Sequence, residues 1–268
     1  MNGKTILSGI VVLVINLNIL GCANVTSAFL TSDTFISAAA IEDDDYPVRK
    51  EIRQTFQLSP NGTVDVSGIE GAVEVETTNG STVEIVFVRE APTQKDFDCE
   101  TISVEQSADK LVISHLTKKE KQCRIIQARE HLKLTVPRSA NLTFENIEGD
   151  FSVGATEGFL RLKNIEGAVR IEQAQAAELG SIESNVSLNV AEINAPGIKI
   201  NNIEGSVEVG VKKDLNADLK INSANFQIDI PNNQTNVSGR KSYQLQLGTG
   251  GENISISNIE GVVKIRGI

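Results

Sequence analysis

Acidic residues recur in this sequence at a regular spacing. The triplet Ile-Glu-Gly occurs at 69–71, 147–149, 165–167, 203–205 and 259–261, and Ile182-Glu183-Ser184 is a degenerate copy. Short strands flank each triplet, so alternation would bury the Ile and expose the Glu. Stacked copies would then form a Glu column of Glu148, Glu166, Glu183 and Glu204, with Glu70 and Glu260 further out.

Carboxylate oxygens are ligands for hard cations, so the chemistry open to the Glu column is weak binding of Ca²⁺ or of a polycation. Each repeat offers one ligand only, which predicts millimolar affinity at best and no dedicated metal site. Without a ligand, the Glu column is a solvated acidic edge that favours solubility and discourages edge pairing.

Residue patterns for catalysis are not found in this sequence. It holds no P-loop, nucleophile elbow or His-Glu-x-x-His motif, and the S-x-x-K match at Ser107–Lys110 lacks its partner motifs. The two histidines, His115 and His131, each lie beside a predicted strand and are expected at the surface. We therefore expect no catalytic residue, no cofactor and no enzyme.

The N-terminal segment is expected to direct export. Lys4 precedes an apolar run over residues 6–20, which is too short for a comfortable membrane span. The run ends in Ile19-Leu20-Gly21-Cys22, which resembles the lipobox of bacterial lipoproteins, although Leu20 replaces the usual small residue. The resemblance implies acylation (palmitate) at Cys22 and, because Ala23 is not Asp, the periplasmic face of the outer membrane. The alternative is an ordinary secretory signal that is cleaved further along the chain.

The cysteine count is consistent with export. If Cys22 carries lipid, Cys99 and Cys123 remain, and a pair in an oxidising compartment usually forms a disulfide. The net charge of −10 makes nucleic-acid binding unfavourable. The expected partners are therefore a membrane, through the lipid anchor, and another envelope protein.

Short alternating segments around the triplets predict an all-β fold. The apolar pairs recur every 17–21 residues, and a unit of this length can bury its apolar face only against its neighbours. The sequence therefore predicts a parallel β-solenoid of about seven coils of 18–19 residues, with an antiparallel β-sandwich as the alternative. The expected segments are a signal peptide (1–21), a tether (22–46), a diverged N-terminal β region or cap (47–136) and the repeats (137–268).

The repeats resemble the bacterial putative-adhesin domains of unknown function over about residues 50–268. The similarity lies in a strand ending in Val136-Pro137, then Leu142-Thr143-Phe144, a turn with Gly and a Val-x-Val strand. The family usually has Ser-Gly-Asp in that turn, where this chain has Ile-Glu-Gly. The resemblance implies a β-solenoid at the cell envelope and carries over no catalytic residues.

The expected function is that of a non-enzymatic envelope lipoprotein whose surface binds a partner. The alternatives are a surface adhesin and a carbohydrate-processing β-helix. The second needs aromatic platforms for sugars, and this chain has no Trp and only Tyr46 and Tyr243 as tyrosines.

Overall fold

The protein is an all-β protein, as its alternating sequence predicts. The computed structural model describes residues 45–118, 123, 128–231 and 233–268. These residues form the following strands and one short helix: β1 Val48–Gln57, β2 Thr63–Ile69, β3 Ala72–Thr78, β4 Thr82–Ala91, α1 Gln94–Asp98, β5 Glu100–Gln106, β6 Lys110–Thr117, β7 Arg129–Pro137, β8 Asn141–Ile147, β9 Phe151–Ile165, β10 Val169–Ile182, β11 Val186–Val190, β12 Ile198–Ile203, β13 Val207–Val211, β14 Ala217–Ile230, β15 Asn233–Leu247, β16 Asn253–Ile259 and β17 Val262–Gly267.

The prediction of an open β-solenoid of about seven coils is wrong. Hydrogen bonds join seven parallel strands into a closed β-barrel, in the order β10–β12–β16–β14–β17–β13–β11 and back to β10, with the other strands added to it. The ring closes because β10 and β14 are long enough to pair with a different strand along each half. A repeat period in sequence predicts the parallel register but not this closure.

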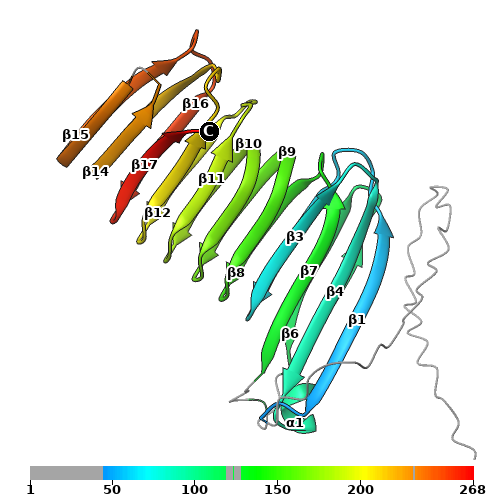
Figure 1. Ribbon diagram of the computed structural model, residues 1–268. Coiled ribbons are helices and arrows are strands. Elements are labelled where there is room, and N and C mark those ends of the chain that lie inside the picture. The colour runs from blue at the N-terminus through cyan, green and yellow to red at the C-terminus, as the bar shows by residue number, and fades with distance from the viewer. Residues whose placement is uncertain (1–44, 119–122, 124–127, 232) are drawn as a thin grey trace, which may run out of the picture. The chain divides into compact units, whose positions relative to one another are not determined.

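The strand order departs from chain order at the C-terminal end. β14 and β15 pair antiparallel as a hairpin, and β16 and β17 then lie between that hairpin and β12 and β13 (Figure 1). Both strands carry the same apolar alternation as the repeats, so alternation alone does not distinguish a hairpin from successive parallel strands. Their lack of the Ile-Glu-Gly triplet is the difference that marks them as a hairpin.

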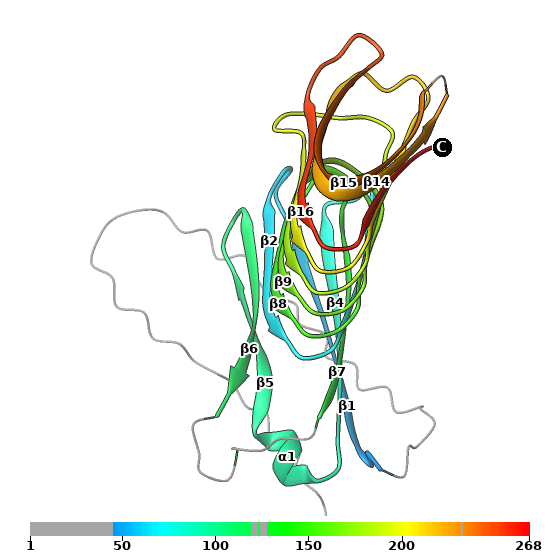
Figure 2. The same ribbon diagram turned by 90° about the vertical axis from the view of Figure 1, so that its left-hand side faces the viewer.

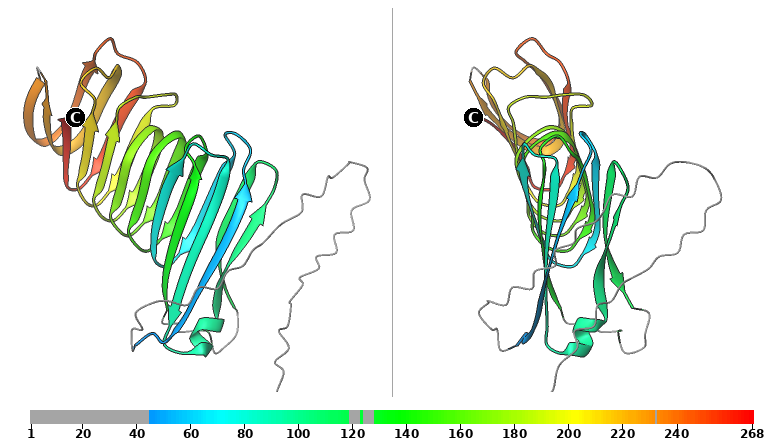
Figure 3. Two further views of the ribbon diagram at one scale, coloured as in Figure 1. Left: turned by 45° about the vertical axis from the view of Figure 1, so that its right-hand side comes forward. Right: turned by 90° about the vertical axis from the view of Figure 1, so that its right-hand side faces the viewer.

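The N-terminal strands extend both sides of the barrel. β9 pairs with β10 along its length, and its first and second halves pair on the other side with β3 and β8. Beyond β3, the hydrogen-bonded order continues through β7 and β4 to β1. Beyond β8, it continues through β2 and β6 to β5. Strands therefore lie in two facing layers joined by turns (Figures 2 and 3). The core between the layers consists mainly of Val, Leu and Ile, with an edge-on pair, Phe144 and Phe151, whose ring centroids are 4.7 Å apart.

Asn and Gly have different roles in the repeated turn. The residue before the triplet takes a positive φ of 54–58°, as Asn at 146, 164, 202 and 258 and as Ser181 in the degenerate copy. Asn tolerates this conformation better than most residues. The triplet Gly is needed for space instead, since a Cβ on Gly167 would lie 2.4 Å from the Gly149 carbonyl carbon. Nothing in the structure explains how Ser184 is accommodated in the equivalent place.

The predicted disulfide is confirmed, since Cys99 and Cys123 are bonded and both are buried. The short helix α1 precedes Cys99 and begins at Thr93, whose hydroxyl accepts a hydrogen bond from the Asp96 N–H. The sequence does not predict this helix. Residues 118–129, whose sequence favours a helix or a loop over a strand, lie mostly outside the described residues.

Removing the disulfide should destabilise the protein. The bonded cysteines are 24 residues apart, and closing a loop of this length restricts the unfolded chain by roughly 3 kcal/mol. We expect the Cys99→Ser, Cys123→Ser double variant to lose about that much free energy of unfolding in urea titrations. Equal urea midpoints for the variant and the oxidised protein would contradict this prediction.

Candidate functional site

The structure places six triplet glutamates side by side along one edge of the two layers. Five of them donate a backbone hydrogen bond to the triplet Ile carbonyl of the neighbouring strand: Glu148 to Ile69, Glu166 to Ile147, Glu183 to Ile165, Glu204 to Ile182 and Glu260 to Ile203, at 2.9–3.0 Å. The Glu column therefore runs in the order 70, 148, 166, 183, 204 and 260, with one carboxylate per strand. The triplet Ile residues are buried and the six glutamates are exposed.

The Glu column lines a groove with a volume of about 830 Å³. The positive-φ residues form its second row, and Asn side chains bond from strand to strand. Asn164 donates to Asn146 Oδ1 at 2.9 Å, and Asn258 donates to Asn202 Oδ1 at 3.1 Å. The groove therefore presents amide and carboxylate groups that repeat once per strand.

Two glutamates on strands outside the groove, Glu178 and Glu208, are paired with cations. Glu178 bonds Arg161 at 2.7 Å and Lys199 at 3.0 Å, and those hydrogen bonds lower its pKa. Glu208 is paired in the same way with Arg266. In the described part of the chain, the only cationic partner of a Glu column carboxylate is His115, 3.9 Å from Glu70.

Mutual repulsion accompanies this lack of partners. The pKa of Glu148 is raised, first by partial burial and then by the negative charges of Glu70 and Glu166. Neighbouring unit charges about 5 Å apart repel by roughly 0.8 kcal/mol in water, before screening by salt. The Glu column therefore costs stability at neutral pH, and a bound cation would relieve that cost.

Replacing Glu148 and Glu183 by Gln should therefore stabilise the protein. The double variant removes four of the five neighbouring charge pairs, which predicts a gain of about 1–3 kcal/mol in the free energy of unfolding at pH 7 and low salt. The control is Glu105→Gln with Glu157→Gln, which makes the same charge change at exposed sites outside the groove.

The gain should shrink as the pH falls. Because its folded-state pKa is raised, Glu148 binds a proton more readily in the folded protein, so the wild type gains stability as pH falls through that pKa. Urea unfolding at pH 7 and near pH 4 measures the difference. A double variant no more stable than its control at pH 7 would show that the Glu column carries no repulsion.

The Glu column ends beside a buried charged cluster that the sequence analysis missed. His115, expected at the surface, has a side chain only 9% exposed. Arg89, Glu100 and Glu130 lie beside it, with side chains 1–3% exposed. His131, the other histidine, lies at the surface as expected, 47% exposed.

Arg89 holds this cluster together. Its guanidinium contacts Glu100 Oε2 at 2.6 Å and lies 3.6 Å from Glu130 Oε1. It also donates to the carbonyls of Phe97 and Asp96 near the end of α1, at 2.8 and 3.3 Å. Burial raises the pKa of Glu100 and of Glu130, and the positive charge of Arg89 opposes the rise in both.

The remaining sequence predictions are not brought into a site. Ser107 and Lys110 pair within the turn before β6, where the Ser107 N–H bonds the Lys110 carbonyl, and Lys110 pairs with Asp65. Cys22 and the expected signal peptide lie outside the described residues. Among the residues that the structure describes, no helix is both long and apolar enough to cross a membrane.

Comparison with known proteins gives remote structural similarity only. No protein-family model and no curated protein matches the sequence. A "putative cell adhesion protein" from Clostridium sporogenes is similar over 82% of this chain and 100% of its own, with 16% identity and a TM-score of 0.37. A "putative adhesin" from Bacteroides fragilis is similar over 82% of this chain and 97% of its own, with 13% identity and a TM-score of 0.31. A "putative adhesin" from Parabacteroides merdae is similar over 81% of this chain and 96% of its own, with 10% identity and a TM-score of 0.31. These values assign neither a fold nor a function.

Proposed function

We propose that this protein is a non-enzymatic binding module of a bacterial cell envelope. Its groove would hold an extended segment, rich in Lys or Arg, of another envelope protein. The observation that supports this proposal is the Glu column: six exposed carboxylates in one groove that have no Lys or Arg partner among the described residues, whereas Glu178 and Glu208 outside the groove do.

The dimensions of the Glu column suit such a segment. Parallel strands lie about 4.8 Å apart, so six carboxylates span roughly 24 Å. An extended peptide rises about 3.3 Å per residue, so some seven or eight residues would cover the column. Exposed ion pairs contribute roughly 0.2–1 kcal/mol each, so six of them sum to about 1–6 kcal/mol, which predicts a Kd between roughly 0.1 M and 0.04 mM at low salt.

The envelope location rests on the N-terminal sequence. The lipobox-like residues 19–22 would anchor the chain through a lipid at Cys22, on the same membrane as other envelope proteins.

Binding of fluorescent decalysine, followed by anisotropy, tests the proposed function. We expect the wild type to bind, and the Glu148, Glu166, Glu183 and Glu204→Gln variant to bind at least about tenfold more weakly, because four ion pairs are lost. The matched control changes four exposed glutamates outside the groove: Glu105, Glu157, Glu172 and Glu192. If the control loses as much affinity as the groove variant, binding depends on net charge and the proposal fails.

A further inference from the structure

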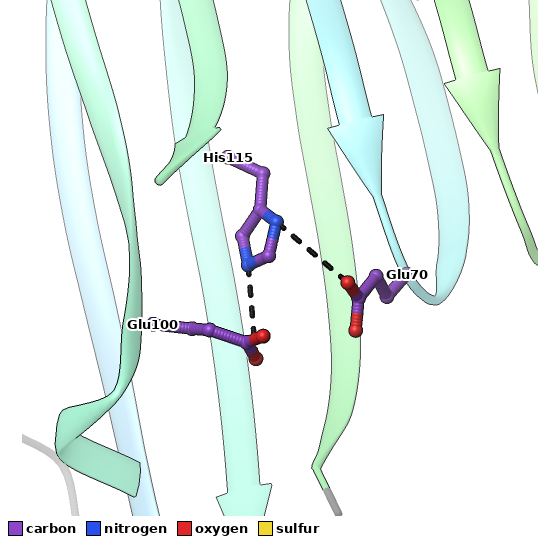
Figure 4. A group of neighbouring side chains, drawn as sticks. All are labelled: Glu70, Glu100 and His115. Atoms are coloured by element: carbon purple, nitrogen blue, oxygen red, sulfur yellow. Dashed lines mark ion pairs between the residues drawn. The ribbon is translucent and has the colours of Figure 1, made fainter. Parts of the chain in front are cut away.

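His115 lies between carboxylates at the end of the Glu column. Its Nδ1 is 3.9 Å from Glu70 Oε1, and its Nε2 is 3.7 Å from Glu100 Oε2 and 3.6 Å from Glu130 Oε1. Figure 4 shows Glu70 and Glu100 approaching the ring from different strands and facing different ring nitrogens. These distances are too long for hydrogen bonds.

Several buried polar atoms here have no hydrogen-bond partner of good geometry. Among the described residues of this cluster they are His115 Nε2, Arg89 Nε and both carboxylate oxygens of Glu130, whose side chain is 1% exposed. The Glu70 N–H is close enough to lower the pKa of Glu130, but it does not form a well-aligned hydrogen bond. Buried polar groups are nearly always satisfied in native proteins, so this set points to a missing positively charged partner.

The charges of the cluster lead to the same conclusion. Among the described residues, this cluster holds three carboxyl groups, those of Glu70, Glu100 and Glu130, and one guanidinium, that of Arg89. The carboxyl groups therefore outnumber the guanidinium by two, and the side chains of Glu100 and Glu130 are buried. Burying unbalanced charge is costly, and one divalent cation would balance it.

We propose that Glu70, Glu100 and His115 bind one divalent transition-metal ion of the zinc class. Each offers a ligand atom, and the three atoms lie within 4.8 Å of one another. Imidazole nitrogen together with carboxylate oxygen favours Zn²⁺ over the all-oxygen sites of Ca²⁺ and Mg²⁺. Nε2 is the ring nitrogen that lacks a partner and faces Glu100, so it is the nitrogen that would bind the ion, and Glu70, which faces Nδ1, would move toward it.

The cluster can close around an ion with small movements. Zinc bonds of about 2.0–2.1 Å place tetrahedral ligand atoms roughly 3.3 Å apart. The present separations of up to 4.8 Å therefore need a contraction of about 1 Å or slightly more. Glu70 can supply much of it because its side chain is 40% exposed, whereas Glu100 is fixed by Arg89.

Titration of Zn²⁺ into the chelator-treated full chain, followed by calorimetry, tests this site. We expect the wild type to bind one Zn²⁺ per chain at micromolar concentration. Losing an outer partner of a metal site costs roughly 10–100-fold in affinity, so His115→Gln, which removes a ligand, should bind at least about 100-fold more weakly. His131→Gln is the matched control, since His131 also faces a carboxylate, Glu74 at 3.9 Å, but at the surface.

A second pair of variants covers the case in which His115→Gln fails to fold. Glu70→Gln should weaken Zn²⁺ binding at least about tenfold, whereas Glu166→Gln, elsewhere in the Glu column, should not change it. The absence of micromolar binding by the wild type would overturn the proposal, as would equal binding by Glu70→Gln and Glu166→Gln. Decalysine binding that persists in His115→Gln and in metal-free wild type separates this site from the proposed function.

Discussion

Replacing Arg89 by Met should cost about 3–5 kcal/mol of the free energy of unfolding, because two buried carboxylates would lose their cation. Glu100 and Glu130 have side chains no more than 3% exposed, so water cannot solvate the charges left behind. The variant also loses the donors to the Asp96 and Phe97 carbonyls, so α1 should be destabilised as well.

Urea unfolding of Arg89→Met beside Arg161→Met measures this effect. Arg161 also pairs with a carboxylate, Glu178, but its side chain is 48% exposed, so its loss should cost at most about 1 kcal/mol. The free energy of unfolding of Arg89→Lys should lie between those of the other two variants, because Lys keeps the positive charge but not the forked donors of the guanidinium. Equal stabilities for the Arg89→Met and Arg161→Met variants would mean that Arg89 does not hold the cluster together.

Replacing Gly71 by Ala should cost about 4 kcal/mol or more. A Cβ there would lie 1.7 Å from the Glu130 carbonyl oxygen, so the backbone of β7 would have to move. Overpacking a core typically costs about 1–3 kcal/mol, and this obstacle is hydrogen-bonded backbone rather than a side chain that can rotate.

Gly180→Ala is the control for this steric argument. Its Cβ would meet only the Asn201 carbonyl oxygen, at an ordinary 3.5 Å, so the substitution should change stability by less than about 1 kcal/mol. Thermal and urea unfolding of the two variants distinguishes them. If Gly71→Ala is as stable as Gly180→Ala, close strand approach does not explain the triplet glycine.

The strands and their register could be predicted from the sequence, but the closure of the sheet could not. Alternation around Leu142, Phe144 and similar pairs marks each strand, and the triplet period aligns neighbouring strands. Whether β14 pairs with β15 as a hairpin depends on contacts between residues far apart in the chain. Alternation does not report those contacts, because β14 and β15 alternate just as the other strands do, and only the missing triplet sets them apart.

The buried cluster could have been found from the same alternation. His115 follows Leu111 and Ile113 at a period of two, so it lies on the buried face of β6. Arg89 stands in the same relation to Ile85 and Phe87 in β4. A charged residue at an inward-facing position of a strand therefore indicates a buried charge. The sequence does not show that β4, β5, β6 and β7 bring these positions together.

Mapping amide chemical-shift changes during a decalysine titration tests the central claim, that the groove of the Glu column receives a cationic partner. The account predicts changes that saturate with the peptide and are concentrated at the amides of Glu148, Glu166, Glu183 and Glu204. The amides of Glu178 and Glu208, whose carboxylates already have cation partners, should change little. Shift changes that are spread evenly over the Glu column amides and those of Glu178 and Glu208, or that are confined to Glu178 and Glu208, would contradict the claim.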